Sequence, residues 1–232
     1  SQGQASQEQE RQQQRLSIKH DGMNRTYNLY VPPSYCGGTA VPLLIALHGG
    51  GGIGRRMLAF TGFGTIADHE RVIVVCPDGF ERHWNDGRDT TGHKAHEQKV
   101  DDVGFIAAVI DQICADHKID KNRIYATGIS NGGMMSYRLG LELSDRIAAI
   151  APVVGALPVN LVEKAKESGA HVRRMPAIIF NGTEDPLVPW SGGEVKFFMK
   201  KLGKVASVQD SVSIWASRNA CAPKPRVSSV PV

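Results

Sequence analysis

One serine of this sequence has the residue type and the setting that covalent chemistry needs. Ser130 is the third residue of Gly-Ile-Ser-Asn-Gly, a G-x-S-x-G pattern that follows the strand-like run RIYAT and precedes a helix-like segment over residues 131–143. In a strand–turn–helix of this kind the serine occupies a strained elbow, and the flanking glycines let the backbones pass without a Cβ clash. The N-terminus of the helix adds N–H groups and a partial positive charge beneath a developing oxyanion. A serine that merely lies in a glycine-rich turn would share the five letters, but the surrounding strand and helix favour a nucleophile.

A second glycine-rich loop could donate N–H groups to the same oxyanion. His48 is followed by four glycines at the end of the apolar run VPLLIAL. Loops of this H-G-G-G type supply a backbone N–H, here from Gly49, Gly50 or Gly51, and the residue after the nucleophile, Asn131, supplies the other. A phosphate-binding loop is the alternative, but no G-K-[ST] follows and the glycine spacing is wrong for a dinucleotide fold. We expect His48 to hold the loop by hydrogen bonds rather than to act as the base.

A carboxylate that could orient a catalytic imidazole follows another buried run. Asp185 lies in NGTEDPLVPW, directly after MPAIIF. Its neighbour Glu184 is a weaker candidate, and a simple turn residue before Pro186 is the other interpretation of Asp185. The position of Asp185 favours the triad acid.

The histidines do not complete this set. In this kind of triad the chain order is Ser, then Asp or Glu, then His, and no histidine follows Asp185. His171 precedes the strand of the acid, in a polar, helix-like stretch, and would reach the site only by an irregular route. We therefore expect the base to lie beyond residue 232.

Strand-like and helix-like segments alternate along the chain. The pattern begins with an antiparallel hairpin around Asp21-Gly22, and nearly continuous apolar runs then indicate strands buried on both faces. Expected strands cover 16–20, 25–31, 41–50, 71–79, 123–128, 148–156 and 175–182, and expected helices cover 55–69, 101–117, 131–143, 194–202 and 208–219. This order predicts an α/β fold with a mainly parallel central sheet flanked by helices. The loops at the carboxyl ends of such strands form the active site.

Length and composition limit the remaining possibilities. The 232 residues suit one domain, which we expect over 16–232, after a disordered Gln-rich tail over 1–15. Scattered basic residues with a net charge of +4 do not favour a nucleic-acid partner, and no apolar run is long enough for a membrane span. Four dispersed cysteines predict no metal site, and no cofactor is expected. The chain begins without Met, which suits an exported protein whose signal peptide was removed.

Taken together, these segments resemble the α/β-hydrolase family of poly(3-hydroxybutyrate) depolymerases and feruloyl esterases. The resemblance runs from about Arg25 to Cys221 and rests on RTYNLYVP, PLLIALHG, VCPDG with Trp84-Asn85, VDDVGFI, RIYATGISNGG and NGTEDPLVPW. It implies Ser130 as nucleophile, Asp185 as acid, an oxyanion hole from the His48 loop and Asn131, and a secreted or periplasmic setting. Family members carry the catalytic histidine after an element like 215–221, so the resemblance also implies a C-terminal truncation.

The resemblance implies a carboxylic ester hydrolase that acts through a serine acyl-enzyme. Polyhydroxyalkanoate polyesters, feruloyl or other aryl esters and short-chain esters all fit a pocket built from loops. Trp84 and Trp190 are candidate walls for an acyl or aromatic group. A non-catalytic ligand-binding homologue, and a thioesterase or peptidase on the same triad, stay open as alternatives.

Overall fold

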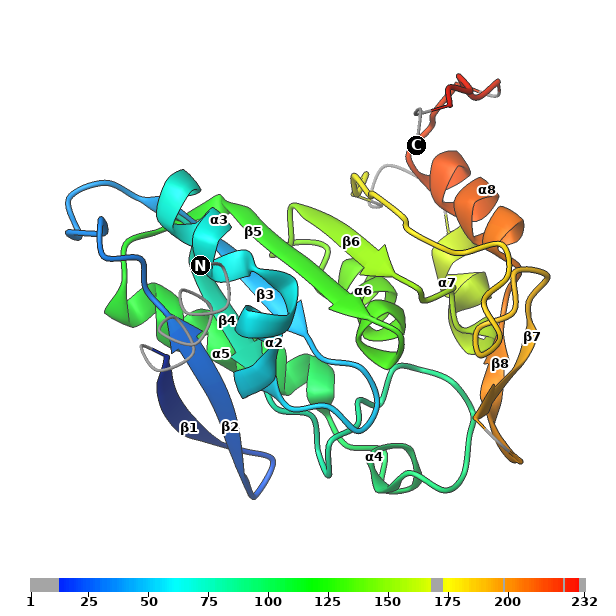
Figure 1. Cartoon of the computed structure of the whole chain (residues 1–232), viewed down its shortest axis with the longest axis horizontal. Helices are drawn as coiled ribbons and strands as arrows, with labels where there is room; N and C mark the ends of the chain where they lie inside the picture. Colours follow the sequence, from blue (N-terminus) through cyan, green and yellow to red (C-terminus); the bar gives the residue numbers. More distant parts are fainter. Residues whose placement is uncertain (1–12, 168–172, 198, 223, 230–232) are drawn as a thin grey trace.

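A mixed β-sheet forms the centre of the molecule. The computed structural model describes residues 13–167, 173–197, 199–222 and 224–229. The strands of the main sheet are β1 (Gln14–His20), β2 (Met23–Tyr30), β3 (Val41–Leu47), β4 (Ile73–Pro77), β5 (Ile119–Ile129) and β6 (Ala149–Val153). Their order is β1-β2-β4-β3-β5-β6 (Figure 1). β4, β3, β5 and β6 are mutually parallel, whereas the β1–β2 hairpin joins β4 antiparallel. The predicted parallel sheet with its N-terminal hairpin is confirmed.

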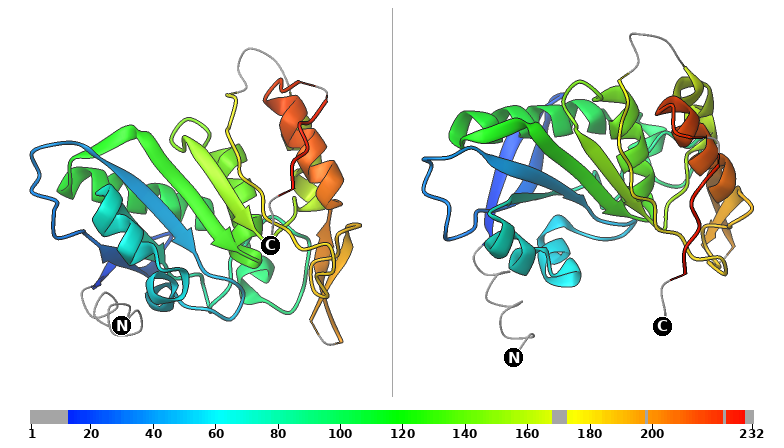
Figure 2. Two further views of the ribbon diagram at one scale, coloured as in Figure 1. Left: turned by 45° about the horizontal axis from the view of Figure 1, so that its top comes forward. Right: turned by 90° about the horizontal axis from the view of Figure 1, so that it is seen from above.

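Helices cover both faces of this sheet. They are α2 (Gly54–Thr61), α3 (Phe63–Glu70), α4 (Lys94–Glu97), α5 (Asp102–Asp116), α6 (Asn131–Glu142), α7 (Val162–Lys166), α8 (Val208–Arg218) and the 3₁₀ helix η1 (Val159–Leu161). Figure 2 shows α2 and α3 on one side of the sheet and α5 on the other. Alternate residues of β3 pack into two cores: Leu43 and Ile45 face the α5 and α6 side, and Ala46 faces α2 and α3. Burial on both faces explains why β3 is apolar throughout.

Three predicted elements differ from the structure. Residues 55–69 form two helices rather than one, because Gly62 between them has a φ of +68°. The predicted strand 175–182 does not form; this segment makes only two isolated parallel β-bridges to β6, Ala177 with Ile150 and Phe180 with Val153. The predicted helix over 194–202 is wrong, since this region is an antiparallel hairpin described next.

The hairpin consists of β7 (Gly193–Phe197) and β8 (Lys200–Val205). Val195 and Val205 are buried in one small cluster with Val188, which a pleated pair of strands places on one face. Gly193 and Gly203 have φ values of +100° and +82°, a region that interrupts a helix. In Figure 1 the hairpin lies beside α7 and α8, at the end of the sheet where β6 lies.

The N-terminal boundary of the expected domain lies earlier than residue 16. β1 begins at Gln14 and therefore includes Gln14 and Arg15 of the expected tail. Gln13 is also described, whereas residues 1–12 of that tail and His171 lie outside the described residues. Within the described part of the chain, no helix combines the length and the apolar character that crossing a bilayer requires.

Candidate active site

The Ser130 elbow is the most constrained turn of the site. Ser130 has φ +53° and ψ −117°, a positive-φ combination that a non-glycine residue adopts only under strain. Its N–H donates to the carbonyl of Val153 at 2.8 Å, which fixes the turn against β6. A Cβ on Gly128 would lie 2.4 Å from the Gly132 carbonyl oxygen, and a Cβ on Gly132 would lie 2.5 Å from that of Leu47. The two glycines of the motif are therefore required by the close passage of β5, α6 and β3.

The His48 loop passes directly beside this elbow. A Cβ on Gly49 would lie 3.6 Å from the Cβ of Ser130, and Gly51 has a φ of +77°. The buried His48 ring approaches the Gly49 carbonyl through Nδ1 at 2.8 Å and accepts the Gly79 N–H on Nε2 at 2.9 Å. Burial lowers the pKa of His48, which favours the neutral ring that these two contacts require. With both nitrogens engaged, His48 holds the loop, as the sequence led us to expect.

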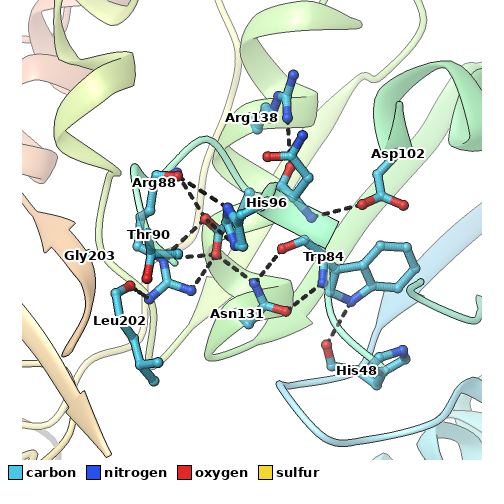
Figure 3. A network of polar contacts seen from close by, with 12 residues as sticks. His48, Trp84, Arg88, Thr90, His96, Asp102, Asn131, Arg138, Leu202 and Gly203 are labelled. Carbon is cyan, nitrogen blue, oxygen red and sulfur yellow. Dashed lines mark hydrogen bonds and ion pairs between the residues drawn. The ribbon is translucent and has the colours of Figure 1, made fainter. Parts of the chain in front are cut away.

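Asn131 has two separate tasks in this geometry. As the first residue of α6, its backbone N–H has no acceptor within the helix. Its buried side chain accepts the Trp84 N–H at 2.8 Å and donates to the Trp84 carbonyl at 3.0 Å and to Asp86 at 2.5 Å (Figure 3). The side chain thus fixes the loop after β4, and the backbone N–H stays available beside Ser130.

Neither Trp84 nor Trp190 forms the substrate wall that the sequence led us to expect. Trp84 is fully buried in the core, and its Nε1–H donates to the His48 carbonyl at 2.9 Å (Figure 3). It supports the His48 loop from the core side and presents no face to a ligand. Trp190 lines a separate hollow with Val208 and Cys221, against α8.

A buried ion pair extends from Asn131 to the β7–β8 hairpin. Asp86 and Arg88 are 0% and 5% exposed, and Arg88 Nε and Nη2 donate to the Asp86 carboxylate at 3.0 and 2.7 Å. Arg88 Nη1 also donates to the Leu202 carbonyl at 2.6 Å (Figure 3). Burial opposes ionisation of Asp86, but Arg88 outweighs it and lowers the pKa of the carboxyl. One network therefore connects the elbow, the loop after β4 and the hairpin.

A second buried carboxylate holds the same loop from the other side. Asp102, at the start of α5, accepts the Asn85 N–H at 2.7 Å and Arg25 Nη2 at 2.6 Å. Burial raises the pKa of Asp102, while Arg25 acts in the opposite direction. The segments RTYNLYVP and VDDVGFI thus contribute to positioning the loop.

Asp185 lies at the border of the site. Its Oδ1 accepts the N–H groups of Leu187 and Val188 at 2.8 and 2.9 Å, which closes a turn after the residue 175–180 segment. Leu187 and Val188 line the same cavity as Ser130. The neighbouring Glu184 is exposed. The structure thus brings the Asp185 turn to the cavity that Ser130 lines.

This cavity has a volume of about 340 Å³. Its lining combines Ser130 and its loop neighbours with apolar and basic side chains: Gly50, Gly51, His83, Arg88, His93, Ser130, Asn131, Leu187, Val188, Val195, Lys196, Phe197, Lys200 and Leu202. Within the described residues, no set of three or more His, Cys, Asp or Glu side chains is arranged to hold a metal ion.

Two histidines of this cavity were not expected from the sequence. The rings of His83 and His93 stack with their centroids 3.7 Å apart and their planes 6° apart. Burial, reinforced by His93, lowers the pKa of His83 to about 3, so the ring is neutral near pH 7. The sequence feature that could have indicated them is the loop after β4, because it is rich in polar residues and follows a parallel strand. Within the described residues, no imidazole forms a hydrogen bond with the Ser130 hydroxyl.

Comparisons with known proteins identify a matching family model and similar esterases. Residues 37–213, more than half of the chain, match the family model described as phospholipase/carboxylesterase. Feruloyl esterase B of Piromyces equi is 31% identical over 84% of this chain and 35% of its own length. The bifunctional acetylxylan esterase/xylanase of Neocallimastix patriciarum is 28% identical over 78% of this chain and 24% of its own length. The chain therefore spans about a third or less of these two relatives.

A solved structure shows the same fold. The crystal structure of a thermostable esterase aligns with 91% of this chain and 52% of its own, with a TM-score of 0.62 and 20% identity.

Proposed function

The chain belongs to the phospholipase/carboxylesterase family, and we propose that it carries the core of a carboxylic ester hydrolase with Ser130 as the nucleophile. The observation that carries this proposal is the backbone of Ser130, held at φ +53° and ψ −117° between β5 and α6. Strain of this kind persists only where the surroundings enforce it. Here it presents a hydroxyl to a cavity beside two glycine-rich turns.

The proposed reaction proceeds through an acyl-enzyme. The Ser130 oxygen attacks the ester carbonyl carbon while a base takes the hydroxyl proton, and the resulting oxyanion accepts N–H groups from Asn131 and from the loop 49–51. The tetrahedral intermediate expels the alcohol, which receives the proton. Water then attacks the acyl-enzyme and releases the acid. Each oxyanion donor is typically worth about 10²–10³ in rate.

Asp185 is the proposed orienting acid of this reaction. In the order Ser–acid–His, the imidazole base follows the acid in the chain, and these 232 residues contain no histidine after Asp185. His48 is not available for this task, because both of its ring nitrogens hold the loops around Gly49 and Gly79. We propose that the base comes from a histidine outside these residues.

Three classes of ester are proposed as substrates: feruloyl or other aryl esters, short-chain esters and polyhydroxyalkanoate-type polyesters. The relatives named feruloyl esterase and acetylxylan esterase favour aryl and acetyl esters. Leu187, Val188 and Val195 give the cavity apolar walls that suit such acyl groups. We also propose a secreted or periplasmic location, on the resemblance to this esterase family.

The test is the turnover of 4-nitrophenyl butyrate by a version of the protein extended beyond Val232 to include the base and by its Ser130→Ala variant, with the exposed Ser34→Ala as the matched control. We expect Ser130→Ala to abolish turnover, because loss of the nucleophile costs about 10⁶ in a comparable serine hydrolase. A fluorophosphonate should label Ser130 and no other serine of the extended version. The 232-residue chain alone should turn over the ester several orders of magnitude more slowly, because it lacks the base, and added imidazole should accelerate its turnover. Unchanged turnover in Ser130→Ala would refute the proposal.

A panel of substrates distinguishes an esterase from a thioesterase, a peptidase or a non-catalytic binding protein that uses the same site. Thioesters and peptides should react more slowly than esters of matched acyl groups. Tight ligand binding without turnover or labelling, also in a version extended beyond Val232, would instead identify a binding protein.

A further inference from the structure

The side chain of Asn131 is held at three points. Its Nδ2 donates to Asp86 Oδ2 at 2.5 Å and to the Trp84 carbonyl at 3.0 Å, and its Oδ1 accepts the Trp84 N–H at 2.8 Å. Asn131 is only 2% exposed, so its amide has no room to turn. The backbone N–H of the same residue is the proposed oxyanion donor beside Ser130. Because the amide and this N–H belong to one residue, contacts that fix the amide also restrain the N–H.

The Asp86 carboxylate that holds Asn131 is itself fixed at both oxygens. Oδ1 accepts the Arg88 backbone N–H at 3.0 Å, Oδ2 accepts Arg88 Nη2 at 2.7 Å, and Arg88 Nε lies 3.0 Å from each oxygen. A fork of this kind sets the orientation of a carboxylate as well as its distance. The direction in which Oδ2 meets the Asn131 amide is therefore determined by Arg88.

Arg88 is fixed in turn by the β7–β8 hairpin. Its Nη1 donates to the Leu202 carbonyl at 2.6 Å (Figure 3). A Cβ on Gly203 would lie 3.0 Å from the Cβ of Arg88, so the backbone of β8 packs closely against this side chain. A continuous series of short contacts thus runs from β8 through Arg88 and Asp86 to Asn131.

Stability alone does not account for this ion pair. Asp86 and Arg88 are 0% and 5% exposed, and taking two such ions out of water costs several kcal/mol for each ion. Apolar residues of similar volume are often as stable at such positions. They would leave the Asn131 amide without its third partner. What the ion pair adds is therefore the orientation of Asn131.

The position of an oxyanion donor has a large effect on the rate. A donor is effective when it lies about 2.7–3.1 Å from the place where the oxyanion forms. A misplacement of about 1 Å can cost about 10²-fold in rate. Residues that restrain Asn131 can therefore change kcat without contacting the ester.

We propose that Asp86 and Arg88 are positioning residues of the Ser130 site, which hold the backbone N–H of Asn131 where the oxyanion forms. This inference rests on the proposed function, since it assigns a task to residues around the same oxyanion. Both residues act through the side chain of Asn131 rather than on the reacting atoms.

The test uses a version of the protein extended beyond Val232 and two variants of the ion pair. Arg88→Lys keeps a positive charge beside Asp86 but loses the planar fork. The double variant Asp86→Asn with Arg88→Gln removes both charges, so no buried ion is left unpaired. Ile113→Ala, a buried core position of α5 outside this network, is the control for lost stability. Thermal unfolding establishes that each variant is folded at the assay temperature.

We expect both variants of the pair to lower kcat for 4-nitrophenyl butyrate by about 10- to 100-fold and to leave KM within about twofold. The inhibition constant of a trifluoromethyl ketone, which forms a tetrahedral oxyanion on Ser130, should rise in proportion to the loss of kcat/KM. Ile113→Ala should lower the melting temperature without either effect. An unchanged kcat in the variants of the pair, or an equal loss of kcat in Ile113→Ala, would overturn the inference.

The backbone amide of Asn131 reports the same restraint without turnover. In a nitrogen–proton correlation spectrum of the 232-residue chain, the double variant should shift this signal and accelerate exchange of its proton with solvent, whereas Ile113→Ala should not. Unaltered exchange in the double variant would also overturn the inference. Its failure is distinct from that of the proposed function: labelled, active Ser130 with an unchanged kcat in the variants overturns only this inference. An extended version whose Ser130 is neither labelled nor active overturns the proposed function, and the exchange of the Asn131 amide then decides whether the pair holds this residue.

Discussion

The elbow at Ser130, the proposed nucleophile, and the turn at Asp185, the proposed acid, meet at one cavity, yet they are built by different means. The elbow lies between a central strand and a buried helix, and backbone atoms of β3 and β6 approach it from two sides. The Asp185 turn follows a segment that only bridges the sheet, and two N–H groups of its own next residues hold its carboxylate. The tertiary core therefore determines the elbow, whereas local hydrogen bonds determine the turn.

This contrast separates two kinds of sensitivity. A substitution at the elbow must disturb the packing of the sheet, since no free space surrounds its glycines. A substitution in the acid turn can change the chemistry and leave the fold intact. Four predictions test this difference, from the largest expected effect to the smallest.

Asp185→Asn should reduce kcat by about 10⁴-fold in an active version of the protein, the effect of the same change in a serine protease triad. The amide oxygen can still accept the N–H groups of Leu187 and Val188, so the melting temperature should hardly change. Ester turnover and thermal unfolding, measured with Glu184→Gln as the control, check both points. A large fall in stability would show that the turn is part of the core.

Asp86→Asn should destabilise the fold by about 3–5 kcal/mol, because it leaves the Arg88 guanidinium buried without its counter-charge. The matched control is Asp120→Asn, which breaks the exposed pair with Arg123 and should have a much smaller effect. Urea denaturation measures both variants, and equal effects would contradict the role given to burial.

Gly132→Ala should cost roughly 3 kcal/mol or more, since its Cβ would lie 2.5 Å from the Leu47 carbonyl oxygen and one strand or helix must move. Gly182→Ala in the acid segment is the control, because its nearest neighbour would be the Asp185 nitrogen at 4.0 Å. Chemical denaturation of the pair compares the two regions directly. A Gly132→Ala variant as stable as Gly182→Ala would show that the elbow is looser than its geometry indicates.

Acid should weaken the fold through His83. Burial, with a contribution from His93, lowers the pKa of His83 from 6.5 to about 3, so between these values the unfolded chain binds more protons than the folded one. Stability is therefore complete above pH 6.5 and is lost as the pH falls, by about 2 kcal/mol from pH 7 to pH 5. Asp86, whose pKa is also lowered, adds a loss of the same sign at lower pH.

The contribution of His83 is measured by the pH dependence of urea unfolding in the protein and in His83→Gln. The variant should have a flatter profile, and the exposed His69→Gln should not. Parallel profiles for the protein and His83→Gln would contradict this assignment.

The sequence predicted much of the fold and of the elbow. Hydrophobic runs located the parallel strands, and Asp21-Gly22 located the first hairpin, because burial and turn chemistry depend on residues that are neighbours in the chain. The same reasoning failed at 194–202, where Val195 and Val205 pack on Val188 from a distant segment. It also failed for Trp84. Nothing in the sequence indicated that this side chain would be buried and would donate a hydrogen bond to the His48 carbonyl.

What the sequence alone determined is where the elbow lies: the glycines at 128 and 132, with a strand-like run before them and a helix-like segment after them, mark the turn at Ser130. What only the tertiary structure decided is the surroundings of that hydroxyl. The stacked His83 and His93 and the Asp86–Arg88 pair belong to the loop after β4, and Lys196 and Lys200 belong to the β7–β8 hairpin; both segments are far from Ser130 in the chain. Local patterns record how a segment folds, whereas packing between distant segments determines what a substrate meets.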